Sequence, residues 1–184
     1  MSSRKLELRD AALAYLLKHG VANASLRPMA SQLGTSARIL MFHFKSKEGL
    51  LQEVLQELHS RLQSSFLKMN ASRFNTRPVA PLKRFWNWAT KKETFPLLRL
   101  LYEIQIVAAQ NPGEYGRYLK KISLDWQAIV FEALSESLRN DAMSTLCIAV
   151  FDGLLLELMN TGDRARLTRA LDRFISLASA AARR

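Results

Sequence analysis

The stretch SLRPMASQLGTSARILMFHFKSKE, residues 25–48, decides the fold of this chain. It has the pattern of two short helices joined by a tight turn, and the second helix is basic and aromatic. Ser25 can cap the first helix by accepting from a free backbone N–H, and Pro28 is tolerated within the first turn. Gly34 suits the left-handed conformation in which a helix ends and the chain turns.

The spacing around this glycine is that of two helices that cross steeply. Ala30 precedes Gly34 by four residues and is small enough to let the helices touch, and Leu40 follows by six and can close the small core. Thr35 or Ser36 can cap the second helix. The pattern therefore predicts a helix-turn-helix that binds DNA.

The segment from about Leu6 to Leu58 resembles the N-terminal domain of the TetR/AcrR family of bacterial transcriptional repressors. Three stretches carry this resemblance, and two near the C-terminus are similar to segments common in the family: Ser25–Ala30, Gly34–Ser36, Leu40–Glu48, Asp152–Leu156 and Thr161–Arg166. The family usually has Tyr at the position of Met41 and commonly a small residue at that of Arg38. The base sequence that is read should therefore differ.

The resemblance implies a DNA-binding domain at 1–48, an effector-binding and dimerisation domain at 49–184, and a linking helix over about 46–69. It also implies DNA contacts from ten residues, which are Ser25, Arg27, Thr35, Ser36, Ala37, Arg38, Met41, Phe42, His43 and Lys47. The expected partner is double-stranded DNA with a palindromic operator.

Composition is that of a cytoplasmic, DNA-binding protein. The net charge is +11, and residues 1–50 carry 8 basic and 3 acidic groups, 51–110 carry 9 and 4, and 111–184 carry 10 and 9. This distribution favours a phosphate backbone as partner, with simple solvation as the alternative. No window of 18 residues lacks a charge, no apolar segment follows the first residues, and Cys147 has no second cysteine to pair with. We therefore expect no membrane span and no secretory signal.

Apolar residues recur at intervals of three and four almost throughout, which predicts an all-α chain. The expected helices outside the helix-turn-helix cover 6–19, 46–69, 82–92, 95–110, 113–138, 141–160 and 163–182. The polar stretch Asn70–Pro81 contains two prolines and is predicted to be the longest loop.

The second half of the chain is rich in aromatic residues, with eleven of the 16 after Pro81. In the resemblance this half binds a small molecule, so an apolar or amphipathic effector is expected there. Its candidate contacts are Trp86, Trp88, Phe95, Leu98, Tyr102, Ile106, Trp126 and Phe131. Core packing is the alternative for each of them.

The last two helices carry apolar stripes that are expected to pair across a two-fold axis in a homodimer. The candidate interface residues are Leu154, Leu155, Leu158, Leu171, Phe174 and Ile175. The alternative is that these side chains close the core of their own monomer. A dimer is favoured because two heads can read a palindrome, whereas one helix-turn-helix makes few base contacts.

Other chemistry finds little support in the sequence. It contains no phosphate loop, nucleophile motif or metal motif, so we expect neither an enzyme nor a cofactor. Glu103, Asp125, Asp152 and Glu157 lie in apolar helices and either recognise a cationic ligand or face solvent. Cys147 is expected to be a buried apolar side chain. A helical nucleoid protein without sequence specificity remains the rival to a repressor, since it would share the basic charge.

Overall fold

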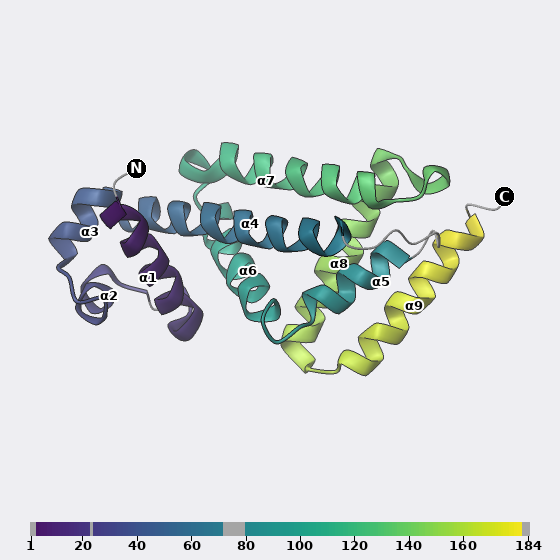
Figure 1. Cartoon of the computed structure of the whole chain (residues 1–184), viewed down its shortest axis with the longest axis horizontal. Coiled ribbons are helices and arrows are strands. Elements are labelled where there is room, and N and C mark those ends of the chain that lie inside the picture. The colour runs from purple at the N-terminus through teal and green to yellow at the C-terminus, as the bar shows by residue number, and fades with distance from the viewer. Residues whose placement is uncertain (1–2, 23, 72–79, 182–184) are drawn as a thin grey trace. The chain divides into compact units, whose positions relative to one another are not determined.

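The computed structural model describes residues 3–22, 24–71 and 80–181, and helices are the only regular elements within these ranges (Figure 1). The all-α prediction is confirmed. The elements are α1 (Ser3–His19), α2 (Leu26–Gln32), α3 (Ala37–Phe44), α4 (Lys47–Ala71), α5 (Ala80–Ala89), α6 (Phe95–Ala109), α7 (Pro112–Ala133), the short 3-10 helix η1 (Glu136–Leu138), α8 (Asp141–Thr161) and α9 (Arg164–Ala181). Most of the predicted loop 70–81 lies outside the described residues, and its two ends are helical.

Polar side chains and glycines define several helix ends. The side chains of Ser36, Ser46 and Asn140 each accept a hydrogen bond from the backbone N–H three residues later, as N-caps do. Gly162 ends α8 in the left-handed conformation, with φ of 68°. The predicted side-chain cap at Ser25 is wrong, because only its backbone carbonyl bonds to the helix.

The predicted helix 113–138 is interrupted after Ala133, where α7 ends. Leu134 and Leu138 are both buried, at 3% and 5% exposure, on either side of the break. The Arg139 guanidinium donates to the Leu134 carbonyl at 3.1 Å and so satisfies one carbonyl that the interrupted helix leaves free. Burial of both leucines and this bond replace the regular helix that periodicity alone predicts.

The chain forms two compact units that are each discontinuous in sequence. The first comprises Met1–Ser65 and Lys92–Leu119, and the second comprises Phe66–Lys91 and Lys120–Arg184. The division predicted at residue 48 follows chain order instead. It would place α6 in the second domain, whereas α6 packs against α1 within the first unit.

The first unit is built on leucines of α1 and α4. Its fully buried side chains include Leu8, Leu13, Leu16, Leu50, Leu55 and Leu58. Ion pairs flank this core where α1 meets α4: Arg9 contacts Glu57 at 2.9 Å, and Arg61 contacts Asp10 at 3.0 Å. These pairs are partly exposed, so the buried leucines contribute most of the stability and the pairs fix the register of the two helices.

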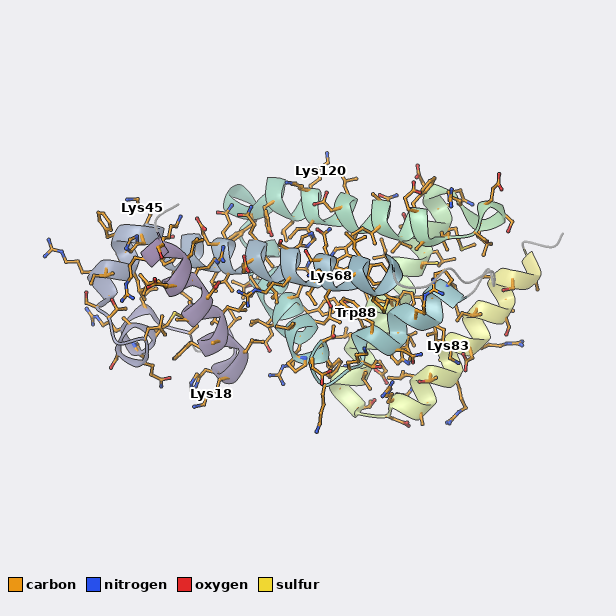
Figure 2. The ribbon with its side chains drawn as sticks, in the orientation of Figure 1. Lys18, Lys45, Lys68, Lys83, Trp88 and Lys120 are labelled. Carbon is orange, nitrogen blue, oxygen red and sulfur yellow. The ribbon has the colours of Figure 1, made fainter. Side chains whose placement is uncertain are left out.

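The second unit contains an aromatic cluster, by which we mean Phe66, Phe85, Trp88, Trp126 and Phe151. Phe85 lies at its centre, with ring centroids 4.6 Å from Phe151 and 5.4 Å from Trp88, which is labelled on α5 in Figure 2. Such contacts add specific ring geometry to apolar burial. The neighbouring Trp86 is fully buried, and its indole N–H donates to the Thr168 hydroxyl at 2.9 Å, which joins α5 to α9.

Among the described helices, α8 is long and apolar enough, by length and composition, to cross a membrane. Length and composition do not distinguish such a span from a helix of a packed domain. Cys147, Phe151 and Leu155 of α8 are buried within the second unit. Asp152 lies on its exposed side.

Candidate nucleic-acid interface

The turn between α2 and α3 is closed by backbone bonds around a glycine. Gly34 has φ of 64°, its N–H donates to Ser31, and the Thr35 N–H donates to the Ala30 carbonyl at 2.9 Å. Ala30 and Leu40 are 1% and 0% exposed, so both predicted contact residues lie in the small core. The helix-turn-helix predicted from spacing is confirmed in its geometry.

The second helix of the motif, α3, is held by its buried side and presents the other. Leu40 and Phe44 are buried, and Ser36 caps the helix by accepting from the Ile39 N–H at 3.3 Å. Of the ten predicted DNA contacts, Ser25, Arg27, Ser36, Arg38, Met41 and Phe42 are exposed, and Thr35, Ala37, His43 and Lys47 are partly exposed. All ten belong to one unit, so the fold gathers them in one region without testing their roles.

Lys45 is a residue of this surface that the sequence prediction missed. It follows α3 directly, is exposed, and adopts φ of 69°, the single positive φ of a non-glycine residue among those described. Its ammonium donates to the Phe42 carbonyl at 3.1 Å and lies 5.6 Å from the centroid of the Phe42 ring. Figure 2 labels Lys45 at the α3 end of the first unit. Its position seven residues after Arg38, two helical turns on, was the available signal.

The junction between α3 and α4 is tightly packed. Ser46 caps α4 by accepting from the Gly49 N–H at 3.0 Å. A Cβ on Gly49 would lie only 2.1 Å from the Phe44 carbonyl oxygen, so only glycine allows this close approach. The Tyr115 hydroxyl donates to the Glu48 carbonyl at 2.8 Å, which attaches α7 to the start of α4.

The charge of this region is of one sign. Arg27, Arg38, Lys45 and Lys47 lie in or beside the motif, and no carboxylate occurs between Ser25 and Lys47. An acidic surface would repel phosphates, whereas this one attracts them and releases the counterions that they hold. Shape, exposure and charge together fit the major groove of a duplex.

The predicted ligand contacts divide between the two units. Trp86, Trp88, Trp126 and Phe131 belong to the second unit, and Phe95, Leu98, Tyr102 and Ile106 belong to the first. Trp88 and Trp126 are members of the aromatic cluster. Ile106 is 59% exposed, and Leu98 is buried at 3%. The structure thus gives these eight residues different surroundings.

The predicted dimer residues also differ in exposure. Leu155, Leu158 and Leu171 are buried in their own unit, at 1%, 7% and 0%, which is the alternative that the sequence left open for them. Leu154, Phe174 and Ile175 are partly exposed. The opposite side of α8 carries an exposed stripe that the prediction missed, hereafter the α8 stripe, made of Ala142, Leu146, Ala149, Gly153 and Leu156.

The carboxylates of the apolar helices have local partners. Glu103 accepts from the Val21 backbone N–H at 3.1 Å, and Glu157 pairs with Arg166 at 2.6 Å. Within the described residues, no group of three His, Cys, Asp or Glu side chains is placed to hold a metal ion. Cys147 is fully buried, as predicted, and burial raises the pKa of its thiol to about 11.

Comparisons with known proteins agree with this geometry. Residues 8–54 match the family described as bacterial regulatory proteins, tetR family. The chain is 30% identical, over 129 residues, to the HTH-type nicotine-responsive transcriptional repressor HdnoR of Paenarthrobacter nicotinovorans, a match that covers 65% of this chain and 66% of that repressor.

Two solved structures share the fold. A transcriptional regulator from Rhodococcus sp. Rha1 aligns with a TM-score of 0.79 and 18% identity over 96% of each chain. The multidrug binding protein EbrR complexed with ethidium aligns with a TM-score of 0.66 and 19% identity, over 93% of this chain and 98% of that one. At these identities the likeness concerns the arrangement of helices.

Proposed function

Because the chain belongs to the tetR family of bacterial regulatory proteins, we propose that it is a homodimeric repressor whose binding to a palindromic operator is controlled by a small molecule. The family consists of DNA-binding regulators and not of enzymes. The observation that carries the proposal is the exposed, carboxylate-free face of α3 and its flanks, held rigidly by Leu40 and Phe44.

The α8 stripe supports the dimer. Its members recur at intervals of four and three residues, so they form one continuous line along the helix. Leu146 and Leu156 are 47% and 52% exposed, and a Cβ on Gly153 would meet nothing within 4 Å. On α9 of the same unit Leu177 is 54% exposed. Large apolar side chains in such a line are typical of an interface between helices, and small residues among them allow close approach.

Leu156→Glu tests the dimer. A carboxylate in the paired α8 stripes would be desolvated next to its own symmetry mate, so sedimentation equilibrium should give a monomer with weakened operator binding. Leu67→Glu, which changes a leucine of α4 that is 53% exposed, is the matched control and should remain a dimer. A dimeric Leu156→Glu protein would refute this interface.

The aromatic cluster supports an apolar, aromatic effector. Phe66, Trp88 and Phe151 are buried at 2%, 3% and 4%, and Phe85 and Trp126 are partly exposed. Rings at these distances can separate to admit another flat ring and restore the same contacts with it. The names of two similar proteins mention nicotine and ethidium, both of which contain aromatic rings.

Contacts of α6 and α7 support a route from effector to DNA. Within the first unit, Glu103 of α6 accepts from Val21 after α1, and Tyr115 of α7 donates to Glu48 of α4. Both α4 and α7 continue into the second unit. A ligand that displaces these helices would therefore act on the base of the DNA-binding head as well as on its linking helix.

A paired measurement tests the effector. Nicotine and ethidium are screened by thermal shift without DNA, and each compound that stabilises the protein is then tested for its effect on operator affinity. Regulation requires different affinities for the two states of the protein, so the compound must change operator binding several-fold. Trp126→Ala should abolish this response and leave ligand-free DNA binding intact. If compounds stabilise the protein and operator affinity stays constant, ligand control through this cluster is refuted.

A further inference from the structure

The outer face of α3 is apolar, which is unusual for a surface that meets phosphates. Ile39, Met41 and Phe42 are 41%, 43% and 71% exposed, and they lie on one helix of eight residues. Phe42 is the most exposed large apolar side chain among the described residues. Exposed apolar groups that lie together in this way mark a binding surface.

Phe42 occupies the centre of this outer face. At about 100° per residue it lies roughly 200° around the helix axis from the buried Leu40, so it points away from the core. Arg38, one turn earlier, is exposed on the same side. When the helix enters a major groove, Phe42 is therefore the side chain that meets the floor of the groove.

The chemistry of Phe42 and its neighbour limits what it can recognise. A phenyl ring has no donor or acceptor for a base edge or a phosphate oxygen. The Lys45 ammonium lies 5.6 Å from its centroid and donates to its carbonyl, which fixes a positive charge beside the ring. In the major groove, the apolar group that distinguishes one base pair from another is the C5-methyl of thymine.

We propose that Phe42, with Met41 beside it, reads thymine methyl groups, so that each operator half-site contains an A·T pair at the position facing the centre of α3. This inference rests on the proposed function, because it assumes sequence-specific binding through α3. Lys45 then neutralises a nearby phosphate while the ring contacts the methyl. Specificity at this position comes from apolar contact, and Arg38 supplies hydrogen bonds to a neighbouring base pair.

Thymine-to-deoxyuridine substitution tests the proposal because it removes the methyl and keeps every base-pair hydrogen bond. Sites are first selected from random duplexes with the full-length protein, and each thymine of the selected site is then replaced in turn. At one position per half-site, Kd should rise about fourfold per methyl, the ratio equivalent to ~0.8 kcal/mol for one buried apolar carbon. Phe42→Ala should bind thymine and deoxyuridine duplexes equally, as a double-mutant cycle requires.

Controls separate the possible results. Leu67→Ala removes another exposed apolar side chain, on α4, and should keep the sensitivity to deoxyuridine. If the protein selects no sequence at all, the proposed function fails and this inference fails with it. If a site is selected and no deoxyuridine changes Kd, methyl reading is refuted while sequence-specific binding stands. A Phe42→Tyr variant that binds all duplexes more tightly and is insensitive to deoxyuridine would show that position 42 faces a phosphate, which also refutes it.

Discussion

Gly49→Ala is the substitution whose effect the structure predicts most sharply. In a helix interior, glycine to alanine ordinarily stabilises by about 1 kcal/mol, because alanine loses less backbone entropy. Here the added Cβ would lie 2.1 Å from the Phe44 carbonyl oxygen, which is backbone and not a flexible side-chain end. This oxygen also accepts from the Ser46 N–H at 2.9 Å, so its displacement strains the junction between α3 and α4.

The overpacking cost of about 1–3 kcal/mol exceeds the gain in propensity, so we expect a net loss of stability. For a chain of this length, each kcal/mol lowers the Tm by about 2–4 °C. Operator affinity should fall as well, because the end of α3 moves.

Gly116→Ala in α7 is the matched control, since a Cβ there would meet nothing within 4 Å. It should raise the Tm by a few degrees and leave DNA binding unchanged. Thermal unfolding by circular dichroism, together with fluorescence anisotropy on a selected duplex, measures both effects. If Gly49→Ala stabilises the protein as much as Gly116→Ala does, the close packing of this junction is refuted.

The remaining predictions concern charge, coupling and burial. Lys47→Ala should weaken binding to all duplexes about equally and lower the salt slope by roughly 1, whereas Arg38→Ala should cost about 1–3 kcal/mol on the selected site and relax the choice of one base pair; equal losses on selected and random DNA would refute base reading by Arg38. Glu103→Ala removes the acceptor of the Val21 N–H and should lower the free energy of unfolding by about 1 kcal/mol in urea, since the carboxylate is partly exposed. Because burial raises the pKa of the Cys147 thiol from 9.0 to about 11, the folded protein favours the neutral thiol, so this contribution to stability is complete below pH 9 and is lost as the pH rises toward 11. Native protein at pH 8 should therefore resist iodoacetamide until it unfolds, and rapid alkylation would contradict the burial of Cys147.

The sequence predicts the elements of this fold because their ends are set by local chemistry. Ser36, Ser46, Asn140 and Gly162 act at helix ends through atoms within a few residues of each other. Ser25 shows the limit of this reasoning, since it occupies an N-cap position and its hydroxyl makes no bond to the helix.

Contacts between distant segments were beyond reach of the sequence. The bond from Val21 to Glu103 joins residues 82 apart, and nothing local to either one indicates the other. Helical periodicity likewise places Phe95 and Trp126 on apolar faces without saying that they belong to different units. The candidate DNA contacts could be named because they lie together in one short motif, and the dimer and ligand surfaces could not because they depend on tertiary packing.

Binding of the wild-type protein to a selected palindromic duplex, compared with a random duplex of equal length, tests the central claim most directly. We expect two chains per duplex and an affinity for the selected site tighter by a factor on the order of 10³ or more at physiological salt. One chain per duplex, or equal affinity for the two duplexes, would contradict a dimeric, sequence-specific repressor and would favour a basic protein that binds DNA through its charge alone.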